Sequence, residues 1–395
     1  MTASRPAARP GRHFLQIPGP SNSPDRVLSA MSKPTMDHRG PEFGQFAKGL
    51  LTDIRKVFQT EQPVVIYPSS GTGAWEAALV NLFQPGDRLL MAETGQFATL
   101  WRELAERLGY ETEFIPGDWR HGVDPAAVEA RLKAADAGAI KAVCMVHNET
   151  STGAASRVEA VRGAIDAAGH DALFLVDTIS GLASMDYRHD AWGVDVTVAG
   201  SQKGLMTPPG LSFNAVGPKA LAAAKSGGVR RSYWDWQAML DLNAGGYFPY
   251  TPATNLLYGL REAVDMLLEE GLPQVFQRHF RLAEAARHAV QAWGLEILCQ
   301  TPAERSNVLT AVLLPDGHDA DALRKIILEN FDVSLGNGLG KVKGKVFRIG
   351  HLGDFNEPML LGTLSAVEMG LKLADAPHQA GGVDAAMRYL ADNPA

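Results

Sequence analysis

Two apolar stretches near the middle of the chain decide the fold class: A-L-F-L-V-D at residues 172–177 and V-D-V-T-V-A-G-S-Q-K-G at residues 194–204. Each has the length and the β-favouring residues of a strand that is buried on both faces. Such strands are typical of a parallel sheet with helices on both sides. In these sheets ligands bind beyond the carboxyl ends of the strands. Asp177 and Lys203, which follow the two apolar runs, are therefore the first candidates for a functional site.

The sequence on either side of these stretches alternates apolar runs with helical patterns, as parallel βαβ units do. The expected strands are Val64–Tyr67, Arg88–Met91, Ala139–Val146, Ala172–Val176 and Val194–Ala199. The expected helices are Ala74–Phe83, Ala98–Leu108 and Val158–Ala168. We therefore expect an α/β fold whose large, mostly parallel sheet is covered by helices on both faces.

The C-terminal part of the chain has a different pattern, with strands and helices that do not form regular βαβ units. A helical stripe ends at Gly271, and a boundary is expected there. The later expected elements are strands at Val308–Leu314 and Val346–Ile349 and helices at Pro273–Trp293, Ala320–Asn330 and Pro358–Leu373. The predicted division is an N-terminal arm at residues 1–20, a large α/β domain at 21–270 and a small α+β domain at 271–395.

The composition argues against several classes of protein. Hydrophobic residues make up 46% of the 395 residues and charged residues 21%, which excludes a disordered chain. The net charge of −7 gives no reason to expect nucleic acid or an anionic membrane as partner, and no apolar run reaches the roughly 18 residues of a spanning helix. The two cysteines can form neither a disulfide framework nor a four-thiolate zinc site, and no metal site is expected. The basic N-terminus lacks an apolar stretch, so a cytoplasmic protein is expected.

A glycine-rich segment, S-S-G-T-G at Ser69–Gly73, lies between an expected strand and an expected helix. Backbone N–H groups at a helix start bind phosphate, and neighbouring hydroxyls add hydrogen-bond donors. Taken alone, the segment is more often an ordinary turn with a helix cap, so both interpretations stay open. It matches neither G-x-G-x-x-G nor G-x-x-x-x-G-K-[ST], which argues against dinucleotide and nucleoside triphosphate sites.

Asp177 and Lys203 gain weight from being found together. Each alone has an ordinary alternative, because a strand-end Asp can cap a helix and most lysines are solvated. The apolar strand before Lys203 and the T-P-P-G sequence at Thr207–Gly210 after it indicate a shaped pocket, in which burial makes a lysine nucleophilic. A phosphate cradle, an acid and a lysine 26 residues after the acid match the needs of pyridoxal 5'-phosphate. These needs are a phosphate site, a carboxylate for the pyridine nitrogen and an amine for a Schiff base.

An arginine of the small domain, Arg348, lies within the strand-like K-V-F-R-I-G at Lys345–Gly350. Its guanidinium offers a rigid fork for a substrate carboxylate. Without the other motifs, an ion pair on a sheet surface would be the more common interpretation.

The chain resembles the fold-type-I, class V aminotransferases, and within them the serine–glyoxylate and alanine–glyoxylate aminotransferases. The resemblance covers nearly the whole chain. It is carried by strings at Pro10–His13, Pro18–Asn22, Gly71–Glu76, Val146–Gly153, Ala199–Gly204, Tyr250–Pro252, Leu257–Glu262 and Gly344–Gly353. The resemblance implies transfer of an amino group from serine to glyoxylate in two half-reactions, with alanine or aspartate as alternative donors.

The resemblance also implies roles for individual residues. Lys203 would carry the cofactor and move the proton, and Asp177 would pair with the pyridinium nitrogen. The other residues implied around the cofactor are Ser70, Gly71, Thr72 and Gln202 at the phosphate, Thr150 at the phenolic oxygen, Phe97 on the ring, and Tyr250 and Thr251 from a partner subunit. Those implied around the substrate are Arg348, Gly19, His38 and Arg39. A homodimer with shared active sites follows, acting on an amino acid and a 2-oxo acid.

Two basic residues and one departure from the family pattern leave questions open. Arg230 and Arg231 are either part of a solvated loop, which we favour, or a site for the second carboxylate of a donor such as aspartate. Thr178 follows the strand-end Asp where many relatives have Gly, and it could alter the donor preference.

Two other enzyme classes are disfavoured by the sequence. Cysteine desulfuration needs a reactive cysteine on a mobile loop, whereas Cys144 lies in an expected strand and Cys299 lies outside the matching strings. An NAD-dependent dehydrogenase needs the glycine motif that this chain lacks. A non-catalytic binding module is disfavoured because Lys203, Asp177 and Arg348 are all present.

Overall fold

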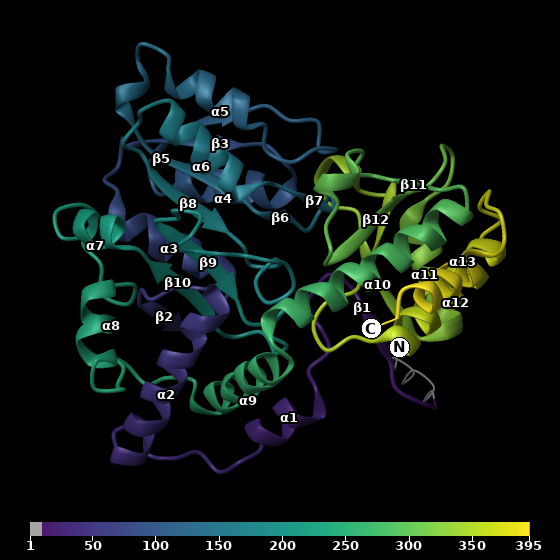
Figure 1. Ribbon diagram of the computed structural model, residues 1–395, viewed down its shortest axis with the longest axis horizontal. Coiled ribbons are helices and arrows are strands. Elements are labelled where there is room, and N and C mark those ends of the chain that lie inside the picture. The colour runs from purple at the N-terminus through teal and green to yellow at the C-terminus, as the bar shows by residue number, and fades with distance from the viewer. Residues whose placement is uncertain (1–9, 395) are drawn as a thin grey trace, which may run out of the picture.

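The computed structural model describes residues 10–394, which form two sheets in two halves of the molecule (Figure 1). The larger sheet has seven strands in the order β2-β10-β9-β8-β5-β3-β4. They are β2 (Val64–Tyr67), β10 (Ser212–Val216), β9 (Val196–Gly200), β8 (Leu173–Asp177), β5 (Ile140–Val146), β3 (Arg88–Ala92) and β4 (Glu111–Ile115). All neighbours are parallel except at β10, which is antiparallel to both β2 and β9. The expected mostly parallel sheet is confirmed.

The large sheet separates two hydrophobic cores. Successive side chains of a strand point to opposite faces, so Val64 and Ile66 of β2 enter one core, and Val65 and Tyr67 enter the other. The helices that contribute two or more buried residues to the first core are α2 (Pro41–Phe58), α5 (Pro125–Leu132), α6 (Val158–Ala167) and α9 (Thr254–Glu270). Those that contribute to the second are α3 (Gly71–Leu82), α4 (Gln96–Arg107), α7 (Pro218–Ala224) and α8 (Trp236–Asn243). The result is a three-layer α/β/α arrangement.

The smaller sheet is mostly antiparallel and has the order β1-β13-β14-β12-β11. Its strands are β1 (Phe14–Gln16), β13 (Val333–Asn337), β14 (Val346–Gly350), β12 (Leu309–Leu313) and β11 (Glu296–Ile297). One core on this sheet is shared with α10 (Leu272–Ala292), α11 (Ala320–Phe331), α12 (Glu357–Leu373) and α13 (Gly382–Asp392). β1 pairs in parallel with β13, so part of the expected N-terminal arm joins the C-terminal half. Residues 1–9 of that arm lie outside the described residues.

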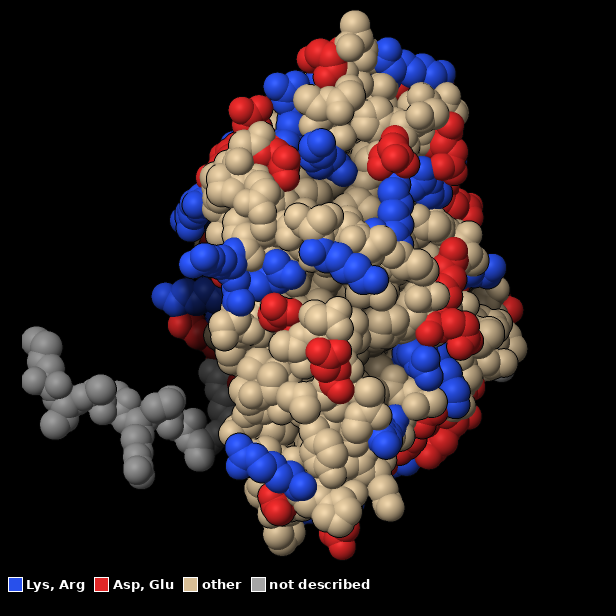
Figure 2. Space-filling model, turned by 90° about the vertical axis from the view of Figure 1, so that its left-hand side faces the viewer, with Lys and Arg blue, Asp and Glu red and all other residues tan. Residues whose placement is uncertain are grey.

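Shorter elements complete the described chain. α1 (Asp25–Met31) packs on α9, and β6 (Asn148–Glu149) pairs with β7 (Ala154–Ala155) just after β5. Among the described residues, no helix is both long enough and apolar enough to cross a bilayer. On the face drawn in Figure 2, basic and acidic side chains are interspersed and neither sign covers the face.

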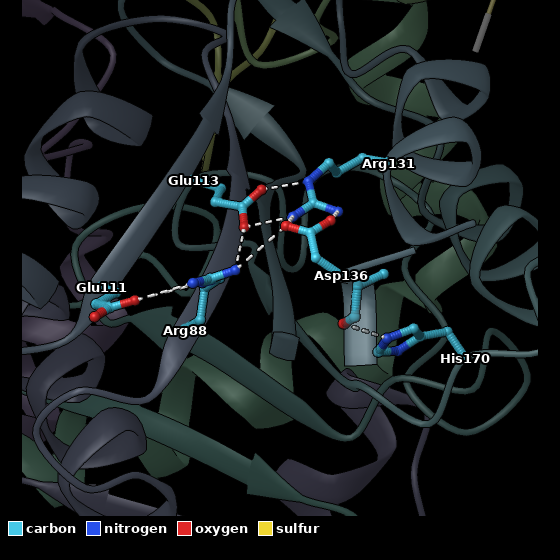
Figure 3. Close-up of polar contacts among 7 residues, drawn as sticks. Arg88, Glu111, Glu113, Arg131, Asp136 and His170 are labelled. Atoms are coloured by element: carbon cyan, nitrogen blue, oxygen red, sulfur yellow. Dashed lines mark hydrogen bonds and ion pairs between the residues drawn. The ribbon is translucent and has the colours of Figure 1, made fainter. Parts of the chain in front are cut away.

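An ion-pair network lies at the outer edge of the large sheet (Figure 3). Arg88 and Glu111 are the first residues of β3 and β4, and their side chains lie 3.4 Å apart. Arg88 is also 3.4 Å from Glu113, which forms a second ion pair with Arg131 of α5. Asp136 completes the network at 3.1 Å from Arg131. Because it lies at the start of these strands, the network is at the opposite end of the sheet from the carboxyl ends, where ligands bind.

Candidate active site

Lys203 lies three residues after β9 and is only 8% exposed. Its Nζ donates a hydrogen bond to the carbonyl oxygen of Pro18. Gly19 lies directly against the lysine, because a Cβ built at residue 19 would be 2.3 Å from Lys203 Cδ, and its φ of +97° also favours glycine. Burial, assisted by the charge of Arg348, lowers the pKa of Lys203 to about 8. A substantial share of the amine is therefore neutral near physiological pH.

Asp177 is the last residue of β8 and is buried. Its Oδ1 accepts a hydrogen bond from the backbone N–H of Ile179 at 2.7 Å, and its Oδ2 accepts one from Trp75 Nε1 at 2.8 Å. Burial raises the pKa of Asp177 to about 7 despite these two donors. A carboxylate fixed in this way, at the carboxyl end of a central strand, is placed to bind a cationic ring nitrogen.

The glycine-rich segment forms the first turn of α3. The helix begins at Gly71, earlier than the expected start at Ala74, and Ser70 is its N-cap. A Cβ at Gly71 would be 2.3 Å from the Ile179 side chain, and one at Gly73 would be 1.9 Å from Ser69 Oγ, so this turn needs glycine. The Ser70 side chain makes no capping hydrogen bond. The N–H of Gly73 donates to Ser70 O, whereas those of Gly71 and Thr72 have no partner within residues 10–394 and are left for an anion such as phosphate.

One cavity of about 130 Å³ brings most of the expected cofactor residues together. It is lined by the expected residues Ser70, Gly71, Thr72, Phe97, Thr150, Asp177, Gln202 and Lys203. It is also lined by Trp75, Val146, Asn148, Ile179 and Ser180, to which the sequence interpretation gave no role. Gln202 Oε1 is buried and has no hydrogen-bond partner among residues 10–394. It is therefore free to take part in binding.

Arg348 reaches this site from the small sheet. It lies in β14, is buried, and donates from Nε to the carbonyl oxygen of Asn337 at 2.8 Å and from Nη1 to that of Thr150 at 2.7 Å. Burial lowers the pKa of Arg348 to about 10, which leaves it cationic at neutral pH. None of the ion pairs found in the described part of the chain involves Arg348. A buried cation without a paired carboxylate, next to a cavity-lining residue, is suited to bind a substrate carboxylate.

Six expected site residues do not line this cavity: Gly19 and Arg348, described above, and Tyr250, Thr251, His38 and Arg39. Tyr250 is half-buried and stacks on Tyr233 with ring centroids 4.2 Å apart, and its hydroxyl has no partner within residues 10–394. Thr251 and Arg39 are exposed, and His38 lies half-buried on the turn before α2. Their service to a neighbouring subunit stays a prediction.

Of the residues whose roles were left open, Arg230 is exposed and does not line the cavity, whereas Arg231 and Thr178 have partners in the fold. Arg231 donates from Nη1 to the carbonyl oxygen of Val229 at 3.0 Å and from Nη2 to that of Ala224 at 3.5 Å. The guanidinium thus binds main-chain carbonyls near the end of α7. The hydroxyl of Thr178 lies 2.9 Å from His147 Nδ1, and Thr178 does not line the cavity.

A buried carboxylate that the sequence interpretation did not single out holds the start of α4. Glu149 accepts hydrogen bonds from the backbone N–H groups of Phe97 at 3.3 Å and Ala98 at 3.1 Å. Ser151 Oγ accepts one from Gln96 N at 2.9 Å and donates one to Glu149 at 2.6 Å. These contacts place Phe97 at the cavity. The only indication in the sequence was that Glu149 falls within the string at residues 146–153.

Comparison with known proteins gives matches over nearly the whole chain. A family model described as "Aminotransferase class-V" matches residues 13–348. The chain is 47% identical to a serine–glyoxylate aminotransferase of Methylorubrum extorquens, over 100% of this chain and 99% of the relative. It is 42% identical to an L-aspartate–glyoxylate aminotransferase of Paracoccus denitrificans, over 94% and 95%. The crystal structure of pyridoxamine–pyruvate aminotransferase from Mesorhizobium loti is similar, with a TM-score of 0.90, 27% identity and coverage of 96% and 97%.

Proposed function

The chain belongs to the class-V aminotransferases, and we propose that it transfers the amino group of L-serine to glyoxylate, giving hydroxypyruvate and glycine. The observation that carries the proposal is the single cavity in which Lys203, Asp177 and the start of α3 meet beside Arg348. The name of the relative at 47% identity over the whole chain supports serine as the donor. Glyoxylate has no side chain, so the same small site can serve both half-reactions.

The residues around the cavity fit pyridoxal 5'-phosphate as the cofactor. A Cβ at Gly71 would collide with Ile179, so this glycine keeps the phosphate end of the cavity open. The Gln202 amide, whose oxygen has no partner within residues 10–394 and whose N–H groups would donate to the phosphate, and the Asp177 carboxylate, held by Trp75, supply polar groups that such a molecule requires. The residues that would hold the cofactor are Ser70, Gly71, Thr72, Phe97, Thr150, Asp177, Gln202 and Lys203. When bound, the cofactor supplies an electron-withdrawing ring that acidifies the Cα–H bond of the donor.

Three side chains have separate roles in the reaction. Arg348 binds the α-carboxylate of the donor and of the acceptor, and so orients the Cα–H bond. Lys203 Nζ takes the proton from Cα of the donor and later returns a proton to the carbonyl carbon of glyoxylate. Its lowered pKa allows the amine to act as a base near pH 8. Asp177 keeps its negative charge next to the ring nitrogen, where Trp75 and Ile179 hold it.

Serine is favoured over aspartate by the charges around the cavity. Lys203 is the only basic side chain that lines the cavity among residues 10–394, and Arg348 is used by the α-carboxylate. A second carboxylate would therefore need another cation, which Arg231 does not offer because it binds main-chain carbonyls. L-Aspartate stays the second candidate because of the L-aspartate–glyoxylate relative at 42% identity. In that case Arg39, exposed and without a salt bridge within the described chain, would bind the second carboxylate from a partner subunit.

We also propose that the protein is a homodimer with shared sites. Tyr250 and Thr251 would then reach the partner's phosphate site, and His38 and Arg39 its substrate pocket. Mixing the Lys203→Ala and Thr251→Ala variants under conditions of subunit exchange tests this. Shared sites predict that the mixture recovers activity, because one site of each mixed dimer is intact. Sites complete within one chain predict no gain over the average of the two variants.

The donor is tested by a half-reaction titration of the purified enzyme. Serine, alanine and aspartate are added separately without an acceptor while the visible absorption band of the cofactor is followed. We expect serine to bleach the band at the lowest concentration and glyoxylate to restore it. If aspartate bleaches the band at a lower concentration than serine does, L-aspartate is the donor and the serine assignment is wrong. A wild-type protein without any visible band, or a Lys203→Ala variant with an unchanged band and activity, would overturn the proposal.

A further inference from the structure

Ser180 connects the polar residues on one side of the cavity, and the proposed mechanism does not use it. Its hydroxyl makes three hydrogen bonds: with Asn148 O at 2.9 Å, with Asn148 Nδ2 at 2.8 Å and with Thr150 Oγ1 at 3.0 Å. Ser180, Asn148 and Thr150 all line the cavity, and each is more than nine-tenths buried. Water therefore has little access to these bonds.

The direction of these bonds follows from counting protons. A serine hydroxyl has one proton to donate and two lone pairs that accept. A carbonyl oxygen only accepts, so the proton of Ser180 goes to Asn148 O. Both remaining partners must then donate to Ser180, and Thr150 therefore uses its hydroxyl proton on Ser180 Oγ. Toward the cavity, the Thr150 hydroxyl can offer only a lone pair.

The side chain of Asn148 adds a second acceptor to the same group. Its Nδ2 is used by Ser180, and its Oδ1 is buried and has no hydrogen-bond partner in the described chain. A buried acceptor without a partner is unfavourable unless a ligand supplies a proton. The Thr150 hydroxyl oxygen and Asn148 Oδ1 thus have only lone pairs left to offer a ligand, while Asn148 Nδ2 keeps a second proton.

We propose that Ser180 is a positioning residue that turns the proton of Thr150 away from the cavity, so that the ring oxygen of the cofactor meets an acceptor. This inference rests on the proposed function, in which Thr150 helps to hold the cofactor, and on the role at the phenolic oxygen that the family resemblance implies for Thr150. An acceptor stabilises a ring oxygen that carries a proton and gives no support to an ionised one. The bound cofactor therefore keeps its proton to a higher pH than it would beside a donating Thr150.

The charged groups near the cavity do not depend on Ser180. They are Lys203, Asp177, Glu149 and Arg348, and no hydrogen bond or ion pair between any of them and Ser180 occurs among residues 10–394. The nearby His147 is buried, and burial lowers its pKa to about 4, so it stays neutral. Removing the Ser180 hydroxyl thus changes hydrogen-bond directions without changing a charge.

The experiment is a pH titration of the visible absorption band of the loaded enzyme and of its Ser180→Ala variant. Without Ser180, the Thr150 proton is free to point at the ring oxygen and to stabilise its ionised form. We expect the midpoint of the titration to fall by about one pH unit, the size of one hydrogen bond to a charged group. The matched control is Ser184→Ala, because Ser184 Oγ is buried and has no hydrogen-bond partner within residues 10–394, and its midpoint is expected to stay in place.

Two further variants test whether the shift depends on Thr150. In a Thr150→Val background, Ser180→Ala is expected to leave the midpoint unchanged, because the proton that it frees is gone. A shift that persists there would overturn the role of Thr150. The Thr150→Val variant alone, which decides the matter if Ser180→Ala does not fold, is expected to keep or lower the midpoint. A rise of about one unit would show that Thr150 donates in the wild type, and would refute the inference.

The failure of this inference can be told from the failure of the proposed function. If the wild-type protein shows no visible band, the proposed function itself is refuted. If the wild-type band bleaches with an amino acid but the titration midpoint of Ser180→Ala equals that of the wild type, the proposed function stands and only the role of Ser180 is refuted.

Discussion

The buried carboxylate of Asp177 is expected to destabilise the cofactor-free protein, and replacing it by Asn isolates this effect. Burial raises the pKa of Asp177 from 3.8 to about 7. A group whose pKa is higher in the folded state binds protons more tightly there, so stability is lost as the pH rises from about 4 to about 7. Above pH 7 the loss is complete and constant. The Asp177→Asn variant cannot ionise and does not lose this stability.

The size of the effect follows from the difference between the two pKa values. About three pH units correspond to about 4 kcal/mol in total, of which about 2 to 3 kcal/mol falls between pH 5 and pH 8. The Asn side chain also mispairs with Trp75 or Ile179, since it offers one acceptor where the carboxylate offers two. That loss is the same at every pH. The pH-dependent part of the difference therefore reports the carboxylate alone.

The measurement is urea unfolding of both cofactor-free proteins at pH 5 and pH 8. The stability of Asp177→Asn relative to the wild type is expected to rise by about 2 to 3 kcal/mol between these pH values. About 2 kcal/mol of this change falls between pH 5 and pH 7, where the contribution of Lys203 is constant because its pKa is lowered only to about 8, so a third measurement at pH 7 separates Asp177 from Lys203. Asp171→Asn is the matched Asp-to-Asn control, at a fully exposed side chain whose one ion pair is with Lys219. A difference for Asp177→Asn that does not change with pH would refute the reasoning.

Three further substitutions have definite expected outcomes. Gly19→Ala is expected to abolish loading of the cofactor, measured by its visible band, because the new methyl group would occupy the space of the Lys203 side chain at 2.3 Å. Arg348→Lys keeps the charge but loses the fork, so KM for serine and for glyoxylate is expected to rise by about 10- to 100-fold with a smaller change in kcat. Arg131→Ala removes one cation from the network of Figure 3 and is expected to lower the free energy of unfolding by less than about 1 kcal/mol, with the difference vanishing at high salt. An activity loss in Arg131→Ala would contradict its placement away from the site.

Strands that are apolar in sequence were predicted well, and those that depend on distant partners were missed. β2 was predicted at its observed bounds, and β3, β5, β8 and β9 were each predicted within two residues at either end. β10 was not predicted, because Asn214 interrupts its apolar run. In the fold, the Asn214 amide donates to Ala74 O at 3.1 Å and its Oδ1 accepts from Trp236 Nε1 at 3.2 Å. These partners are far away in the sequence, so a local pattern does not contain them.

The site was predicted where position along a strand determines it, and incompletely where contacts determine it. Asp177 and Lys203 follow buried strands, a feature that is visible in the sequence. Trp75 was part of a recognised string but received no role, because its hydrogen bond to Asp177 spans 102 positions. Ser180 and Glu149 were missed for the same reason. Ser180 and Glu149 matter because of the polar atoms with which they form hydrogen bonds, and these partners are brought close only by the packing of several segments.

The same packing explains why the reactive groups come from segments so far apart in the chain. Burial of Asp177 and Lys203 disfavours their charged forms. Each side chain is also held in place by groups that the fold fixes away from solvent. Pro18 and Gly19 hold the lysine, Trp75 holds the carboxylate, and each lies on a different element from its partner. A site made from one loop could relax and hydrate these groups, which would return both pKa values toward their ordinary range. The folded core prevents that relaxation, so the instability of the empty site and the basicity of Lys203 have a common structural cause.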